Sequence, residues 1–390
     1  MALVEESESP LTEYVRPLRS VPLGPLPEDV TRALSPIKWA VAPNGNGCWL
    51  ISDYKLARQV LADRRFRRSD AVSQDVPALS SYNSAPDAII SLEGAEHARI
   101  RRLVAPAFTE RRIAQLAPFV TQSVTDLLDG LESQHPPADF VAHFSSLLPF
   151  GVLCHLLGVP VADREIFGSW VNVLFRLEDN DADSRQQSLA LVRYMMRLVA
   201  EKRRNPAADL ISRLIKSAEG KGSLTNHELV TLCLSLLMAG FDSTVDQITL
   251  CVLTLMLDRA LLKNLHDNQE LAPQVAEELM RINPAPYIAF PRMAKEVVRI
   301  GDVVIEAGQL VVVSILASNR DPAAFGLAHL TFGHGAHRCL GAPLARLQLS
   351  CVLAAVARRF PQLSLAEDVR SLKWKSGMAT RGLRQMYVTW

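Results

Sequence analysis

The sequence predicts a mainly α-helical fold with a smaller β-rich region. From Ala98 to about Leu265, most segments carry apolar residues at three- and four-residue spacing, and prolines at positions 136, 137, 160 and 206 mark the breaks. The first ninety residues contain short alternating runs among turn residues, which favour strands. Because no linker, repeat or charge block divides the 390 residues, we expect one domain over residues 1–390.

Strands are expected at three places in the chain. The run Trp49–Ser52 follows turn residues at Pro43–Gly47. Two apolar runs, Val303–Ile305 and Leu310–Ile315, are separated by a short turn, so we expect them to pair as a hairpin. The last residues, Met386–Trp390, are again typical of a strand.

The clearest helix begins at Thr225. Its hydroxyl can cap the helix while Glu228 reaches back, which is the T-x-x-E capping box. The helix continues without proline to about Asp258, roughly 50 Å at 1.5 Å per residue. It is apolar on nearly all sides between positions 229 and 238, so it must be buried. A shorter helix is expected over Gln274–Ile282, after a proline suited to a first turn.

Composition and charge exclude several classes of protein. The formal net charge of +1 gives no general reason to expect a nucleic acid or an anionic membrane as partner. Glutamates and prolines fill Met1–Leu23, where a signal peptide or anchor would need an apolar run, so we expect a soluble, cytoplasmic protein. The six cysteines lack CxxC pairing, which fits a reduced compartment. We interpret five of them as small buried hydrophobes, Cys48, Cys154, Cys233, Cys251 and Cys351.

The sixth cysteine, Cys339, lies in a segment with glycines at 333, 335 and 341, immediately before an apolar helix. Glycines allow a tight turn and close approach to a flat ligand, and a helix N-terminus favours an anionic thiolate. Two alternatives are a buried structural thiol and a zinc site formed with His334 and His337. The first does not need three glycines, and the second lacks a further CxxC or HxxxH cluster.

This segment resembles the cysteine loop of the cytochrome P450 family. The family pattern F-G-x-G-x-H-x-C-x-G is matched at all six fixed positions, namely Phe332, Gly333, Gly335, His337, Cys339 and Gly341. The resemblance implies the cytochrome P450 fold and a bound haem b, with Cys339 as the thiolate ligand of the iron. It also implies that Phe332, His337 and Gly341 contribute to the haem site.

The stretch from Ala239 to Thr244 resembles the family's A-G-x-[DE]-T-T, which forms a groove for dioxygen over the haem. The resemblance implies that Ala239 and Gly240 lie beside the haem and that Asp242 relays protons. Ser243 departs from the usual threonine, because it keeps the hydroxyl but loses the methyl group that fixes the rotamer, and Thr244 follows it. A hydroxyl bonded back to a helix carbonyl is the alternative interpretation.

Basic residues outside the cysteine loop also match the family. His97 and Arg101 resemble its H-x-x-x-R, and Arg292 resembles a strand-borne arginine, so that together with His337 they would bind the haem propionates. Glu278 and Arg281 resemble the buried E-x-x-R pair, for which an exposed surface pair is the alternative.

One departure from the family is large. Between Phe325 and His329 the family has a longer stretch, including an arginine that completes a triad with the E-x-x-R pair. Either the protein lacks this stretch or the chain omits it, and its absence puts haem retention and docking of a redox partner in question.

The resemblance implies an oxidoreductase, a monooxygenase that hydroxylates or epoxidises a small apolar or aromatic natural product of secondary metabolism. Electrons are expected from a ferredoxin and a ferredoxin reductase. One alternative is oxidative C–C or C–O coupling of aromatic or cyclic-dipeptide substrates, and another is a haem-free recruitment module. The expected pocket comprises residues 71–92, 167–176, Phe241, 288–290 and 378–380, which are largely apolar.

Overall fold

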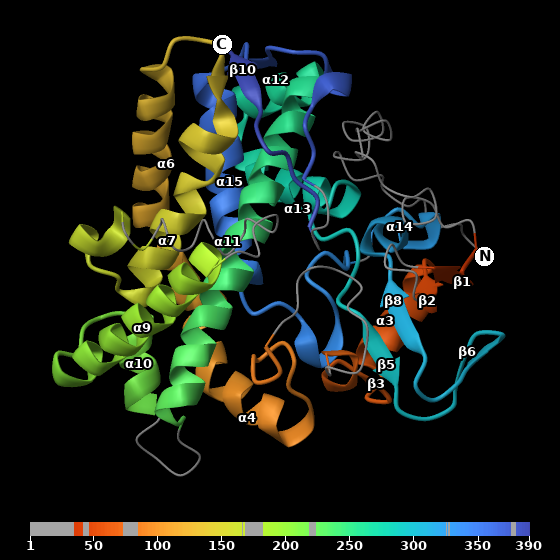
Figure 1. Ribbon diagram of the computed structural model, residues 1–390. Coiled ribbons are helices and arrows are strands. Elements are labelled where there is room, and N and C mark those ends of the chain that lie inside the picture. The colour runs from red at the N-terminus through yellow and green to blue at the C-terminus, as the bar shows by residue number, and fades with distance from the viewer. Residues whose placement is uncertain are drawn as a thin grey trace, which may run out of the picture.

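The computed structural model describes residues 35–41, 47–72, 85–165, 167, 182–217, 224–324, 326, 328–375 and 380–390. A large helical lobe lies beside a smaller lobe that holds most of the strands (Figure 1). The predicted mainly α-helical fold with a smaller β region is therefore confirmed. The helices are α3 (Tyr54–Ala62), α4 (Gly94–Val104), α5 (Glu110–Ala114), α6 (Ala117–Glu132), α7 (Leu147–Leu157), α9 (Ala182–Arg204), α10 (Leu210–Ser217), α11 (Asn226–Leu257), α12 (Arg259–Asp267), α13 (Ala272–Ile282), α14 (Ile315–Asn319) and α15 (Ala342–Arg359).

The strands form three sheets in the described part of the chain. The largest has the order β1-β2-β8-β5-β3, in which β2 and β8 are parallel and the other neighbours antiparallel. The others are β4-β10-β9, which contains the predicted C-terminal strand, and β6-β7. The strands are β1 (Ile37–Val41), β2 (Gly47–Ile51), β3 (Phe66–Arg67), β4 (Ala138–Asp139), β5 (Arg292–Ala294), β6 (Val298–Ile300), β7 (Val303–Ile305), β8 (Leu310–Val313), β9 (Ser364–Leu365) and β10 (Tyr387–Thr389).

The predicted hairpin between β7 and β8 is wrong. Strand β7 pairs instead with β6, and Gly301 occupies the turn between them with a φ of +54° that suits glycine. All four residues of β8 are buried, so this strand lies at the centre of the large sheet, where β2 and β5 flank it. Both runs do form strands, but long-range burial decides their partners.

Helix α11 lies at the centre of the helical lobe. The predicted capping box is confirmed, because Thr225 Oγ1 accepts a hydrogen bond from Glu228 N at 3.1 Å and Glu228 Oε2 accepts one from Thr225 N at 2.7 Å. The helix packs against α7, α9 and α15 (Figure 1). Among the described residues it is the one helix long and apolar enough to cross a membrane, and its place in the core accounts for that composition.

Each lobe has its own apolar core, and the cysteine loop joins the two. Leu330 belongs to the core under the large sheet, whereas Phe332 and Leu340 pack against the core of the helical lobe. Four of the five remaining cysteines are buried as expected, and Cys351 is half-buried, 3.7 Å from Thr121 Oγ1. The fold thus places the loop at the junction of the lobes.

Candidate active site

The cysteine loop is a compact set of turns between the lobes. Gly333 N donates to Leu330 O at 2.7 Å, and Cys339 N donates to Phe332 O at 2.8 Å. Gly333 and Gly335 have φ values of +68° and +74°, which L side chains rarely adopt. A Cβ on Gly335 would lie 2.5 Å from the carbonyl oxygen of Leu61 at the end of α3. Glycine at position 335 therefore lets the loop lie directly against this helix.

Cys339 lies just before α15 and is solvent-exposed. Burial of the surrounding region raises the pKa of its thiol, whereas the backbone N–H groups of Gly341 and Ala342 and the charge of Arg101 lower it. The net direction is upward because burial outweighs these groups, but the N–H groups at the start of α15 act in the direction expected of a helix N-terminus. A bound metal ion would add to their stabilisation of the anionic sulfur.

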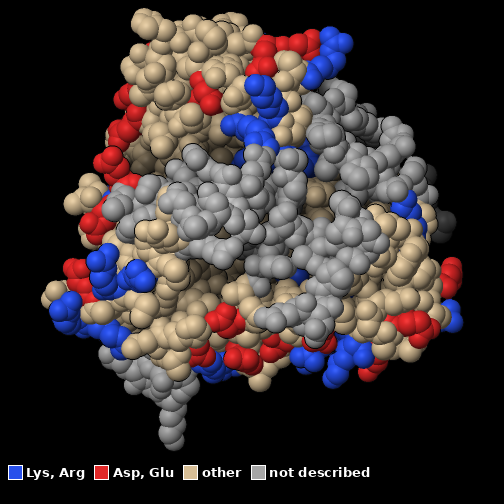
Figure 2. Space-filling model, viewed as in Figure 1, with Lys and Arg blue, Asp and Glu red and all other residues tan. Residues whose placement is uncertain are grey.

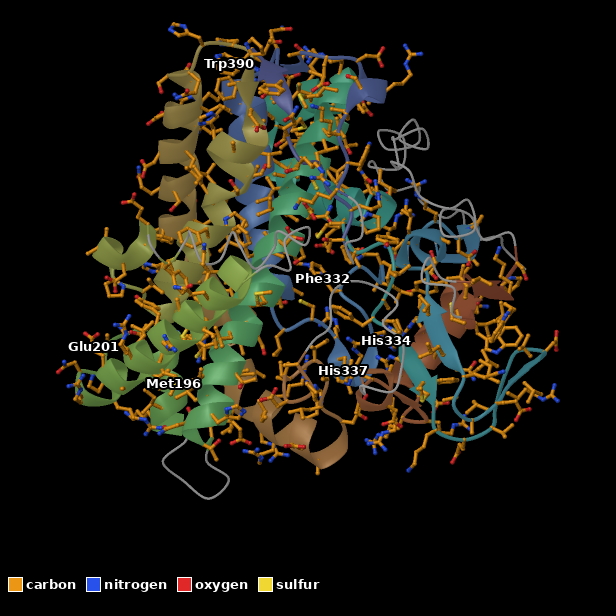
Figure 3. The ribbon with its side chains drawn as sticks, viewed as in Figure 1. Met196, Glu201, Phe332, His334, His337 and Trp390 are labelled. Carbon is orange, nitrogen blue, oxygen red and sulfur yellow. The ribbon has the colours of Figure 1, made fainter. Side chains whose placement is uncertain are left out.

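The predicted basic residues gather beside this loop. The rings of His97 and His337 lie 4.3 Å apart between centroids, and Arg101 donates to the carbonyl oxygen of Arg338 at 2.5 Å. Arg292 is buried and donates to Phe66 O at 3.4 Å. Burial, followed by the charges of His337 and Arg101, lowers the pKa of His97 to about 4. Figure 3 shows His334 and His337 on one segment at the boundary between the lobes.

An acidic residue that the sequence interpretation missed, Glu93, connects this group. Its Oε2 lies 3.2 Å from His337 Nε2, and its Oε1 accepts a hydrogen bond from Arg68 N at 2.6 Å. Burial alone would raise the pKa of Glu93, but His337, Arg68 and the charge of Arg292 lower it. The glutamate directly before α4 was the available signal, since acidic residues favour helix N-termini.

His337 Nε2 supports the presence of an acidic ligand at this place. It is buried and has no aligned hydrogen-bond partner, although Glu93 is close. A buried ring nitrogen without a partner costs free energy, and a carboxylate of a ligand would remove that cost. The donor set of two histidines and two arginines fits the propionates of a haem.

On the other side of the site, α11 carries the predicted oxygen-binding stretch. Ser243 Oγ donates to Ala239 O at 2.8 Å, which confirms the alternative interpretation of a hydroxyl bonded back to the helix. Ala239 and Ser243 share one helix face, four residues apart. A Cβ on Gly240 would lie 3.0 Å from Leu153, so this glycine permits close packing with α7. Packing against α7 is thus a structural reason for the glycine, and its expected position beside the haem stays a prediction.

Asp242 makes ionic contacts that the sequence interpretation did not include. Lys375 Nζ donates to Asp242 Oδ1 at 2.7 Å, and Thr380 Oγ1 lies 3.1 Å from Asp242 Oδ2. The same two groups contact Asp246, one turn further along α11. Thr244, the third predicted catalytic residue, is buried in the helix.

The Glu278 and Arg281 side chains form the expected pair. Arg281 Nε donates to Glu278 Oε2 at 2.7 Å, and Arg281 Nη1 donates to Asn319 O at 2.6 Å. The two side chains are 22% and 16% exposed, so the pair is half-buried rather than buried. The neighbouring Glu277 forms a second pair with Arg346 at 2.5 Å, and Arg346 lies over the ring of Phe332.

The described residues from Ala328 to Thr331, at the start of the cysteine loop, are held by side chains of two other segments. Tyr54 Oη donates to Ala328 O at 2.5 Å, and Asn319 Oδ1 accepts from Leu330 N at 2.7 Å. Asn319 Nδ2 also donates to Thr331 Oγ1 at 2.9 Å. These contacts fix the entry to the cysteine loop. Phe325 lies outside the described residues.

The zinc alternative receives no support, because no three His, Cys, Asp or Glu side chains gather around a possible metal position in the described part of the chain. Among the expected pocket residues, Phe241 is buried in contact with Phe150, and Ala289 N donates to Val313 O at 2.8 Å. Phe290 is 38% exposed. Residues 73–84, 168–176, 378 and 379 of the expected pocket lie outside the described residues.

Comparisons with known proteins agree with this arrangement. A family model described as Cytochrome P450 matches residues 176–328 and 326–381, and the two matches meet where the sequence is shortened. Mycinamicin IV hydroxylase/epoxidase of Micromonospora griseorubida is 37% identical over 368 residues, 91% of this chain and 92% of that protein. Nocardicin C N-oxygenase of Nocardia uniformis subsp. tsuyamanensis is 36% identical, with 92% and 94% covered. A solved structure of a mutant of the mixed-function P450 MycG with mycinamicin V has a TM-score of 0.87 at 36% identity, covering 94% and 96% of the two chains.

Proposed function

The chain belongs to the cytochrome P450 family, whose members carry haem, and from this premise we propose that it is a haem-thiolate monooxygenase. Its substrate is a small apolar or aromatic natural product of secondary metabolism, which it hydroxylates or epoxidises. The observation that carries the proposal is Cys339, exposed at the start of α15 beside two histidines and two arginines. The cofactor is haem b, and residues 1–390 act as one domain.

The residues around the cysteine hold the cofactor. Cys339 supplies the sulfur ligand, and the N–H groups of Gly341 and Ala342 stabilise its negative charge. His97, His337, Arg101 and Arg292 bind the two propionates, and Phe332 packs beside the loop. When bound, the haem supplies dioxygen activation, and thiolate ligation favours cleavage of the O–O bond.

Residues of α11 form the part of the site where dioxygen binds and receives protons. The small side chain of Ala239 leaves space on the face that Ser243 shares, and the Ser243 hydroxyl can turn from the helix carbonyl towards a water molecule. Asp242, in the preceding position, holds a proton for the reaction. Thr244 is buried and packs within the helix, so we assign it a supporting role only.

The nature of the substrate is supported by relatives and by side chains near α11. Relatives act as mycinamicin IV hydroxylase/epoxidase, nocardicin C N-oxygenase and pentalenolactone synthase, which are oxygenations and related steps on natural products. Phe150, Phe167, Phe241 and Tyr194 form a chain of aromatic contacts beside the helix. This surrounding favours an apolar or aromatic substrate.

Electrons come from a ferredoxin and a ferredoxin reductase in the cytoplasm. The six cysteines are dispersed along the sequence, which does not suit an iron–sulfur cluster of the chain's own. On the face shown in Figure 2, acidic and basic side chains are intermixed outside the grey atoms. The formal net charge of +1 likewise favours a local patch as the docking site for the ferredoxin.

The proposal is tested by Cys339→Ser. Reduced protein treated with carbon monoxide should show the red-shifted Soret band of thiolate-ligated haem, and the variant should lose both this band and turnover. Cys351→Ser is the matched control, because Cys351 lies on α15 but is half-buried beside Thr121. A Cys339→Ser variant that keeps the band would overturn the assignment. Wild-type protein without any haem spectrum would favour the haem-free module.

Turnover under labelled dioxygen distinguishes the two enzymatic functions. A hydroxylated or epoxidised product should carry the label, because one oxygen atom comes from dioxygen. An unlabelled coupled product from active enzyme would replace the monooxygenase assignment with oxidative coupling.

A further inference from the structure

Two acidic residues of α11 are joined to a segment near the end of the chain. Asp242 and Asp246 lie four residues apart, so they share a helix face. Lys375 Nζ donates to Oδ1 of Asp242 at 2.7 Å and to Oδ1 of Asp246 at 2.8 Å. Thr380 Oγ1 lies 3.1 Å from Oδ2 of Asp242 and 2.9 Å from Oδ2 of Asp246. We call these four side chains the carboxyl unit.

The number of protons in the carboxyl unit follows from its geometry. A lysine ammonium has three N–H donors, so Lys375 can serve both Oδ1 atoms. A threonine hydroxyl has one proton, so Thr380 can donate to one Oδ2 atom only. If both carboxyl groups were ionised, the other Oδ2 would face the hydroxyl oxygen with no proton between two acceptors. A proton on one carboxyl group turns that contact into a hydrogen bond.

Burial leads to the same conclusion. Asp242 and Asp246 are 7% and 1% exposed, and two neighbouring buried carboxylates repel each other. Gly382 lies against Asp246 so closely that a Cβ there would be 1.8 Å from Oδ1, which leaves no space for water on that side. Burial, followed by the charge of Asp242, raises the pKa of Asp246 to about 7, against the lowering effect of Lys375.

A further cation, Arg381, interacts with Asp246 of the carboxyl unit and follows Thr380 directly in the sequence. Arg381 is buried, and its Nη2 donates to Asn283 Oδ1 at 2.9 Å. Burial, followed by the charge of Arg320, lowers the pKa of Arg381 to about 9, whereas Asp246 and Tyr287 act in the opposite direction. Within the unit, the Lys375 side chain is 21% exposed, more than the side chains of Asp242 and Asp246.

We propose that Asp242 and Asp246 share one proton, and that Lys375 and Thr380 position this pair so that it resupplies protons to the oxygen side of the site. The inference rests on the proposed function, because the monooxygenase reaction consumes protons as well as electrons. Asp242 directly precedes Ser243, so the shared proton is stored next to the helix face that we assign to dioxygen. Asp246, Lys375 and Thr380 are positioning residues.

The shared proton is tested first without turnover. Infrared spectra at neutral pH should contain the band of a protonated carboxyl group, and Asp246→Asn should remove it. Asp53→Asn is a matched control, because Asp53 caps α3 in the other lobe and the asparagine can keep the cap. A spectrum without any such band that depends on Asp246 would overturn the proposal.

The unfolding free energy provides a second test that does not need activity. Between pH 3.8 and about 7 the folded protein holds a proton on Asp246 that the unfolded chain releases, so this group's contribution falls as pH rises through that range. Asp246→Asn should flatten the slope, and Asp53→Asn should not. An unchanged slope in Asp246→Asn would contradict the shared proton.

Turnover then tests the positioning role. Lys375→Met should lower the amount of product formed per electron by about ten-fold and raise the release of hydrogen peroxide. This effect is smaller than the hundredfold or greater loss expected when a general acid itself is removed, because Lys375 only positions the pair. Lys375→Arg should restore much of the coupling, since it keeps a cation with several donors. If Lys375→Met does not fold, Thr380→Val tests the same unit. Wild-type coupling and pH profile in both Thr380→Val and Asp246→Asn would refute the role.

Failure of the proposed function would look different. Wild-type protein would then give no labelled product at any pH, while the infrared band and the unfolding slope would still report on the shared proton.

Discussion

Replacement of Gly335 by alanine should dislodge the cysteine loop from α3. Gly335 has a φ of +74°, and a Cβ there would lie 2.5 Å from Leu61 O and 3.0 Å from Ala62 Cα. Both atoms belong to the backbone, so no side-chain rotation can remove the clash. Arg338 N donates to Gly335 O at 3.1 Å, so a displacement of this turn is transmitted towards Cys339.

The magnitude follows from two contributions. An alanine in the left-handed region costs about 1–2 kcal/mol. Overpacking against a fixed neighbour adds roughly 1–3 kcal/mol. Gly333 is the matched control in the same loop, because its φ is +68° but the nearest atom to its Cβ would be His337 O at 3.9 Å. Gly333→Ala should therefore show the first contribution alone.

The assay combines urea unfolding, followed by circular dichroism, with the haem content of the purified protein. Gly335→Ala should be less stable than Gly333→Ala and should retain less haem, because the clash moves the turn that precedes the sulfur ligand. Equal losses of stability in the two variants would refute the steric argument. Equal haem content would show that the position of this turn does not control cofactor retention.

Three further predictions concern the polar contacts around α13 and the loop. Glu278→Ala should lower the free energy of unfolding, measured in urea, by about 2 kcal/mol. This value lies between those of exposed and buried ion pairs, because the Arg281 side chain is only 16% exposed. A loss indistinguishable from zero would show that the pair does not contribute to stability. Burial would raise the pKa of Glu277, but His329 and Arg346 lower it to about 2. The ionised Glu277 therefore stabilises the folded protein above pH 4.5, and this stabilisation is lost as pH falls towards 2. Glu277→Gln should remove this pH-dependent stabilisation, which is about 1 kcal/mol because a side chain that is 40% exposed is screened by solvent. An unfolding free energy that falls with acid as in the wild type would contradict the prediction. Asn319→Ala should lower the free energy of unfolding by about 1–3 kcal/mol and speed hydrogen exchange at the Leu330 amide, because that amide loses its acceptor. An exchange rate equal to that of the wild type at Leu330 would contradict the contact.

Local signals in the sequence were sufficient for the elements that depend on local chemistry. The capping box at Thr225 and the uninterrupted apolar run after it predicted α11, because capping and helix propensity act within a few residues. The cysteine loop was predicted from fixed positions, of which Gly333 and Gly335 have positive φ values. In both cases the residues that decide the structure are neighbours in the chain.

Contacts between distant residues could not be predicted in the same way. The partner of β7 was misassigned because the apolar runs at 303–305 and 310–315 also have the pattern of a hairpin. Only the packing of β8 between β2 and β5 excludes the pairing of β7 with β8. The contact between Gly240 and Leu153 of α7 was likewise not predicted, because the two residues are distant in the sequence. Such packing brings together segments that are distant in the chain, and a single sequence carries no signal of which distant segments meet.

Lys375 illustrates where a signal existed but was incomplete. Two aspartates four residues apart on a buried apolar helix need partners, because isolated buried charges are costly. The sequence therefore indicates that Asp242 and Asp246 have a cation nearby, but any of its lysines or arginines qualifies. Lys375 is 129 residues from Asp246, and only the fold brings the two together.

Arg281 has a second acceptor besides the glutamate of its E-x-x-R pair. Besides Glu278, Arg281 donates to the backbone carbonyl of Asn319. The side chain of Asn319 in turn holds Leu330 and Thr331, and Thr331 Oγ1 donates to Met280 O at 2.8 Å, back on α13. This closed set of hydrogen bonds connects the helix of the E-x-x-R pair to the start of the cysteine loop. Because the set runs through one buried asparagine, the position of Cys339 should depend on Asn319.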